Sequence, residues 1–97
     1  MRLFFILNQE YRYKLSGFLI VYNMLLYNLK VGQCGKISAI NVEENTLKRL
    51  NDLGLCVGTQ VSVVRFSPFF DPIEIKARDF YLAIRKSVAK KIVVEQI

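Results

Sequence analysis

Residues 60–85 read QVSVVRFSPFFDPIEIKARDFYLAIR, and this stretch decides the fold of the chain. Its first part, residues 60–66, is rich in β-branched side chains and predicts a strand. A period of two predicts two more strands, over residues 73–77 and 80–85. The apolar positions of these two strands, which we expect on the inner face, are Ile73, Ile75, Ala77, Phe80, Leu82 and Ile84.

The flanking segments add two strands and a helix. A strand is predicted over residues 36–42, after a turn at 32–35, and another over residues 92–95, after a short helical turn at 87–91. Between the first two strands, leucines repeat every three positions and predict a helix that begins at an Asn45 cap and ends at Gly54. The leucines expected to face the sheet are Leu47, Leu50 and Leu53.

These elements favour a closed sheet over an open one. Five short strands and one helix cannot form an open, two-faced sheet within residues 24–97 without exposing apolar surface. Rolling the sheet into a barrel buries one face and also pairs the edges. We therefore expect a mainly β fold, a small SH3-like β-barrel of about five strands with the helix lying against it.

Residues 1–23 differ from the rest, because their apolar, aromatic and charged residues follow no sustained period. The uncharged run from Leu15 to Leu29 is too short and too interrupted for a membrane-spanning helix, which needs about 20 apolar residues. It also lacks the cleavage site of a signal peptide and the basic face of an interfacial helix. We expect residues 1–23 to be a poorly ordered, mobile extension and residues 24–97 to be the folded domain.

Charge and reactive residues limit the function. The net charge is +6, but the 14 lysines and arginines are scattered, which is typical of an ordinary basic surface. The chain has no histidine, the commonest metal ligand and the commonest general base near neutral pH. Cys34 and Cys56 belong to no CxxC pair, so we interpret them as buried free thiols rather than as a disulfide.

Neither a metal site nor a catalytic site is predicted. Asp71, Glu74 and Asp79 are the nearest approach to a carboxylate cluster, but nothing makes their oxygens converge as a hard cation requires. The serines and cysteines have no histidine to activate them, and there is no phosphate-binding loop. We expect no catalytic residue, no cofactor and no metal, and a weak Fe(II) site at these carboxylates is the less favoured alternative.

An ordered set of motifs resembles the ferrous iron transport protein A (FeoA) family. Its first half is matched by Leu29-Lys30-Val31-Gly32-Gln33, by Leu47-x-Arg49-Leu50-x-x-Leu53-Gly54-Leu55 and by Gly58-Thr59. Residues 67–73 resemble the family's Pro-x-Gly-Asp-Pro-Ile loop, and Leu82-Ala83-Ile84-Arg85 with Ala89, Ile92 and Val94 resembles its closing signature. The resemblance covers residues 24–97. It departs from the family where Phe70 replaces the loop glycine and where Cys56-Val57-Gly58 replaces x-Pro-Gly.

The resemblance implies a cytoplasmic, SH3-like accessory of the ferrous iron transporter FeoB, a membrane protein with a cytosolic G-domain. Such an accessory docks on the cytosolic part of the transporter and modulates uptake, and neither hydrolyses GTP nor carries iron. It would reach the membrane only through its partner, without inserting. The same fold forms the C-terminal domain of metal-dependent repressors, but no helix-turn-helix precedes it in this sequence.

The loop at residues 67–72 is the predicted partner-binding site. Its two aromatic residues cannot both enter one core, so we expect one of them to be exposed as a hydrophobic anchor. Three arginines, Arg49, Arg65 and Arg85, would add charge complementarity to an acidic partner. Alternatively, both rings tuck under the loop and the arginines are ordinary solvated side chains. The expected partner-binding residues are Phe69, Phe70, Pro72, Arg49, Arg65 and Arg85.

Two other functions stay open. A small basic barrel can bind nucleic acid through aromatic stacking and phosphate contacts, and its affinity would then fall steeply with salt. A module that forms dimers through an exposed strand edge would instead show a mass that rises with concentration.

Overall fold

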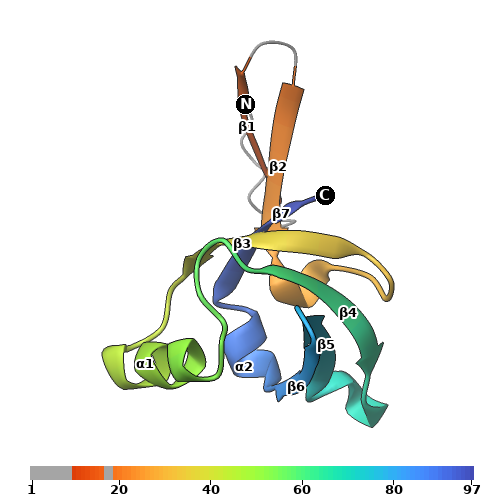
Figure 1. Ribbon diagram of the computed structural model, residues 1–97. Coiled ribbons are helices and arrows are strands. Elements are labelled where there is room, and N and C mark those ends of the chain that lie inside the picture. The colour runs from red at the N-terminus through yellow and green to blue at the C-terminus, as the bar shows by residue number, and fades with distance from the viewer. Residues whose placement is uncertain (1–9, 17–18) are drawn as a thin grey trace.

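The computed structural model describes residues 10–16 and 19–97, with side chains from Asn23 onward. Seven strands form one antiparallel sheet in the order β1-β2-β7-β3-β4-β5-β6 (Figure 1). The strands are β1 (Glu10–Ser16), β2 (Leu19–Leu25), β3 (Cys34–Ile40), β4 (Gln60–Phe66), β5 (Ile73–Ala77), β6 (Phe80–Ile84) and β7 (Ile92–Gln96). The helices are α1 (Glu44–Asp52) and α2 (Lys86–Ala89), together with the 3-10 turns η2 (Leu26–Asn28) and η3 (Pro68–Phe70).

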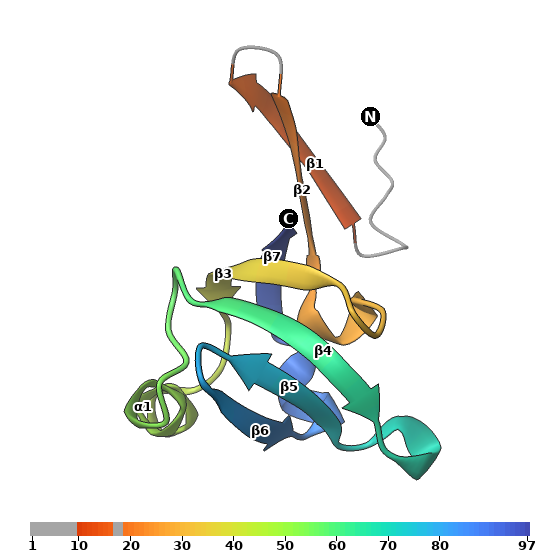
Figure 2. The same ribbon diagram turned by 45° about the vertical axis from the view of Figure 1, so that its right-hand side comes forward.

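The five predicted strands are confirmed as β3 to β7, and the fold is mainly β and SH3-like. The sheet curls from β7 through β3, β4 and β5 to β6 (Figure 2). Hydrogen bonds do not close it, because in the described part of the chain β6 pairs only with β5. The expectation that closure would pair the edges is therefore wrong: β6 remains an edge strand.

The core lies on the inner face of this curl. Alternation placed Ile73, Ile75 and Ala77 inward on β5, and all three are fully buried. Ile84 on β6 is also buried, while Phe80 and Leu82 are half-buried against the core. The other fully or nearly fully buried apolar side chains come from η2, β3, β4, α2, β7 and the loops: Leu26, Leu29, Ile37, Leu55, Val61, Val63, Ala89, Ile92 and Val94.

The cap of helix α1 lies two residues earlier than predicted. Glu43 is its cap, with extended backbone, and the hydroxyl of Thr46 donates a hydrogen bond to the Glu43 carboxylate at 3.2 Å. The expected Asn45 cap is therefore wrong, because Asn45 already lies in the first turn.

The end of α1 is as predicted. Gly54 has φ +101°, and the amides of Gly54 and Leu55 bond back to Asn51 and Leu50 at 3.0 and 2.9 Å, as in a Schellman cap. Of the three leucines expected to face the sheet, only Leu50 is buried, and Leu53 is 47% exposed. The reason is the helical pitch: three residues fall short of a full turn, so a repeat of three drifts off one face.

Strands β1 and β2 were not predicted. Near its end, β2 pairs with β7 through Met24 and Val94, so the strand crosses the expected domain boundary. The side chain of Asn23 is buried there, and the Ser38 hydroxyl donates a hydrogen bond to its amide oxygen at 3.3 Å. Whether residues 1–23 are mobile stays a prediction, and its part on residues 1–9 and 17–18 lies outside the described residues. No helix within the described ranges is long and apolar enough to cross a membrane.

Candidate functional site

Residues 67–72 form a tight aromatic loop between β4 and β5. The Phe70 amide donates to the Ser67 carbonyl at 2.7 Å, and the Ser67 amide donates to the Pro72 carbonyl at 3.1 Å. Phe69 and Phe70 both have left-handed backbone, with φ values of 67° and 62°. Such backbone is rare for bulky side chains and normal for glycine. Phe70 stands where the sequence motif resembling the FeoA loop has glycine, and its backbone lies in the region that glycine adopts readily.

Two contacts from distant parts of the chain hold the aromatic loop in place. The Tyr27 hydroxyl, from η2, donates a hydrogen bond to the Phe70 carbonyl at 2.9 Å. The Asp71 carboxylate accepts a hydrogen bond from the Lys86 backbone amide, at the start of α2, at 2.9 Å. Asp71 therefore caps a helix that begins 15 residues further along the chain.

The two phenylalanines have different surroundings. The ring of Phe70 meets Phe66 edge-on at a centroid distance of 5.8 Å, and Phe66 meets Tyr27 in the same way at 5.8 Å. Phe66 and Tyr27 pack against the core, so Phe70 is supported on one side and still 60% exposed. Phe69 is 92% exposed. The interpretation that one ring is exposed therefore holds for both, and most strongly for Phe69.

Positive charge borders the aromatic loop. The Nζ atoms of Lys86 and Lys90 each lie 5.6 Å from the centroid of the Tyr27 ring, on the side of α2. Neither lysine forms an ion pair with a carboxylate in the described part of the chain. Arg65 does, because its Nε lies 2.6 Å from Oε1 of Glu74, so its charge is partly balanced. Sequence reasoning missed the two lysines and Tyr27, whose roles depend on contacts across 43 to 63 positions.

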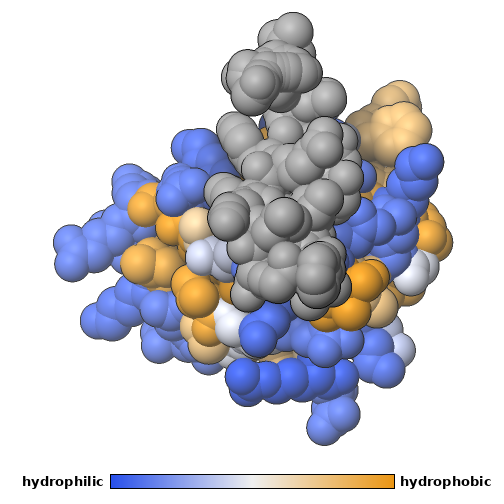
Figure 3. All heavy atoms as spheres, turned by 90° about the horizontal axis from the view of Figure 1, so that it is seen from above, coloured by the Kyte–Doolittle hydropathy of each residue, from blue (hydrophilic) through white to orange (hydrophobic). Residues whose placement is uncertain are grey.

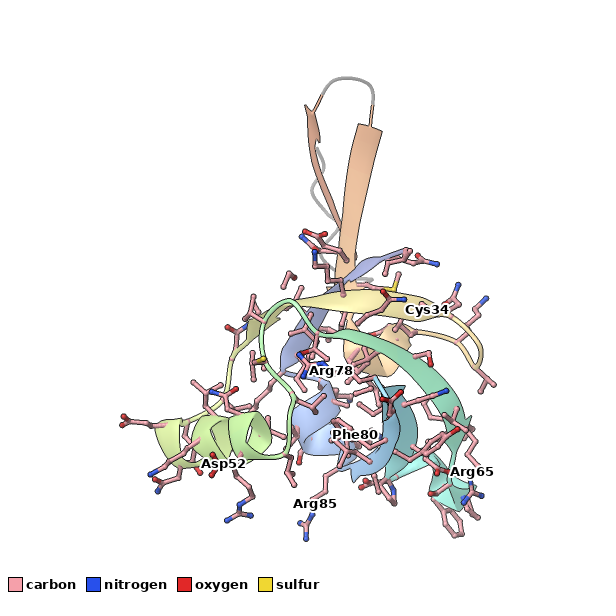
Figure 4. The ribbon with its side chains drawn as sticks, viewed as in Figure 1. Cys34, Asp52, Arg65, Arg78, Phe80 and Arg85 are labelled. Carbon is pink, nitrogen blue, oxygen red and sulfur yellow. The ribbon has the colours of Figure 1, made fainter. Side chains whose placement is uncertain are left out.

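The structure brings most of the expected partner-binding residues to one end of the molecule. Arg65 lies beside the aromatic loop, and Arg85 points away from the barrel below β6 (Figure 4). Pro72 is half-buried at the base of the loop. Arg49 is the exception, since α1 lies on the opposite side of the barrel from η3 (Figure 1).

The three carboxylates considered for metal binding do not gather. Asp71 is engaged with the α2 amide and Glu74 with Arg65. Within residues 10–16 and 19–97, no three residues of the metal-binding types lie close enough together to hold an ion.

Both cysteines are free and half-buried, rather than buried as expected. Cys34 borders an open depression of about 380 Å³ on the outer face of the sheet, with Lys76 and Arg78 among its other lining residues. Seen from above, hydrophilic side chains lie mainly along the left and lower margins, and apolar ones are interspersed among them and reach the right margin (Figure 3).

Fold and site together define a class: a small SH3-like module that presents exposed aromatic side chains on a braced loop. The FeoA domain model matches residues 24–96, and the chain belongs to the FeoA family. No curated protein matches it.

Solved structures agree with this assignment. FeoA from Chlorobium tepidum is 35% identical with a TM-score of 0.73, over 76% of this chain and 70% of that one. A FeoA-like protein from Clostridium acetobutylicum is 29% identical with a TM-score of 0.70, over 77% of this chain and 87% of that one. Zinc-complexed FeoA from Stenotrophomonas maltophilia, an SH3 domain protein suggested to act as a ferrous iron transport activating factor, is 25% identical with a TM-score of 0.62, over 73% of this chain and 88% of that one.

Proposed function

We propose that this protein is a cytoplasmic accessory of ferrous iron uptake, which docks on the cytosolic part of the FeoB transporter through its aromatic loop and modulates transport. It acts by binding rather than by catalysis. Support comes from its membership of the FeoA family and from the activating role suggested for the Stenotrophomonas maltophilia relative.

One observation carries the proposal: the loop presents an aromatic ring at a cost in stability. Phe69 is 92% exposed and has φ 67°, so it gains little from burial and lies in a backbone region that disfavours its side chain. Strained and exposed aromatic residues gather at binding sites, because partner contacts repay what folding does not. Bracing by Tyr27 and Asp71 holds the loop in one shape before binding, which lowers the entropy cost of docking.

The positive charge beside the aromatic loop favours the same binding surface. Lys86 and Lys90 border the loop without carboxylate partners in the described residues, so an acidic surface on the transporter would complement them. We expect these lysines to raise the association rate, with an effect that weakens as salt is added.

The test is an NMR titration of the labelled chain with the isolated cytosolic G-domain of FeoB, with and without GTP, repeated with the whole transporter in detergent. Shifts should concentrate on residues 67–72 and on α2. Phe69→Ala should weaken binding by about 30-fold, as expected for an interface hot spot.

Ile97→Ala is the matched control, because Ile97 is also exposed, at 68%, and the C-terminal end lies away from the aromatic loop (Figure 1). This variant should bind as the unmodified chain does. If Phe69→Ala and Ile97→Ala bind the transporter with equal affinity, the aromatic loop is not the docking site. No shifts with either form of the transporter would overturn the proposal as a whole.

A further inference from the structure

Strand β6 is an open edge without charges. It spans Phe80–Ile84 and pairs with β5 on one side only, in the described part of the chain. In both views it lies along the lower margin of the barrel with no strand beyond it (Figures 1 and 2). Proteins commonly protect such edges with lysine, proline or a bulge, and the sequence of β6, FYLAI, has no charge and no proline. The other edge strand, β1, carries Glu10, Arg12 and Lys14.

The residues that flank β6 are oppositely charged and equally spaced about its centre. Asp79 precedes the strand and Arg85 follows it, each three positions from Leu82. Both are exposed, and neither forms an ion pair with a described residue. Arg85 points away from the barrel at this margin (Figure 4).

We propose that two copies of this chain associate through β6, antiparallel and with the two-fold axis at Leu82. In this register Asp79 of each copy lies opposite Arg85 of the other, so the pairing forms two equivalent ion pairs. On the exposed face, Tyr81, which is 56% exposed, lies opposite Ala83 of the second copy, a large side chain against a small one. Shifting the register by two residues in either direction loses both ion pairs.

The symmetry of this pairing indicates that the strand which adds to the β6 edge belongs to a second copy of the chain. A two-fold interface must be self-complementary, and the edge is self-complementary in charge and in side-chain size. A five-residue edge gives a small interface, so the dimer is weak and reversible. The inference does not rest on the proposed function. In the dimer Arg85 contacts the second copy and is not available to the transporter. Docking on the transporter then depends on the aromatic loop.

Sedimentation of the full chain, from micromolar to millimolar concentration, tests the pairing. The unmodified chain should show a mass that rises from monomer towards dimer. Asp79→Arg or Arg85→Asp alone places like charges opposite each other at both ends of the pairing and should weaken association about tenfold or more. An equimolar mixture of these two variants should associate again, because each supplies the charge that the other lacks. The double variant Asp79→Arg with Arg85→Asp should also recover.

Three results would overturn the inference: a monomeric mass at every concentration, association that both single variants leave unchanged, or a mixture that fails to recover. Because Asp79 lies in a tight connection and its variants could fold poorly, the amide signals of the unmodified chain give an independent readout. Residues 79–85 should shift with concentration. A rise in mass without such shifts would place the contact elsewhere and refute the pairing through β6.

Discussion

Replacing Phe69 with glycine should stabilise this protein, although it removes an aromatic ring. A bulky residue in the left-handed region costs about 1–2 kcal/mol, and φ at Phe69 is 67°. Glycine escapes that cost but loses about 0.5–1 kcal/mol more conformational freedom on folding. The ring is 92% exposed, so its removal sacrifices almost no buried surface. The expected result is a net gain of about 0.5–1 kcal/mol in the free energy of unfolding.

Urea and thermal denaturation measure this gain directly. For a domain of this size, the gain corresponds to a rise in Tm of about 2–8 °C. Phe69→Ala is the matched control: it removes the same ring but keeps a Cβ atom and hence the backbone strain, so its stability should stay within about 0.5 kcal/mol of the unmodified chain. If the glycine variant is no more stable than the alanine variant, the backbone at residue 69 is not strained and the reasoning fails.

Phe70 extends the same argument to the position where the family usually has glycine. Its φ of 62° is similar, but its ring packs on Phe66 and is only 60% exposed. Phe70→Gly removes the strain and also about 1 kcal/mol of packing and partial burial. The two effects should nearly cancel, which leaves Phe70→Gly less stable than Phe69→Gly.

Three further changes test how the structure is held together, each by urea denaturation. Gly54→Ala should destabilise the fold by about 2–3 kcal/mol, because φ is +101° and the new Cβ would lie 2.8 Å from the Phe80 ring. Gly32→Ala is the control: φ is +90° but no atom lies within 4 Å, so this change should cost only about 1–2 kcal/mol. Equal losses would show that the contact with Phe80 is unimportant. Tyr27→Phe should cost about 1 kcal/mol through its lost hydrogen bond to the loop; an unchanged midpoint would mean that this bond adds nothing. Asp71→Ala should cost about 1 kcal/mol and Asp71→Asn less, because asparagine keeps an oxygen that can accept from the first amide of α2; equal losses would contradict the capping role.

The strands that the sequence predicts well are those with local signals. β5 alternates strictly between apolar and charged residues, and in β6 the larger apolar residues Phe80, Leu82 and Ile84 fall on every second position. Turn residues flank both strands, so the predicted bounds agree with the observed ones within one residue. β1 and β2 have no such period. The pairing that fixes the end of β2, between Met24 and Val94, joins residues 70 positions apart, which local patterns cannot reveal.

The difference between local signals and long-range contacts also explains which features of the site could be predicted. Two adjacent phenylalanines between prolines indicate an exposed ring, because one core cannot take both. The bracing by Tyr27 and the two lysines beside it depends on tertiary contacts, so no short motif indicates it. Arg49 was predicted as one of three arginines that complement an acidic partner, and the fold places its helix on the other side of the barrel from the loop.

Uptake of radiolabelled ferrous iron by cells that lack this protein, complemented with variants of the chain at equal expression, tests the central claim most directly. The unmodified chain and Ile97→Ala should restore uptake equally. Phe69→Ala should fail to restore it, although the protein folds normally. Full restoration by Phe69→Ala would contradict the claim that this protein acts on ferrous iron transport through its aromatic loop.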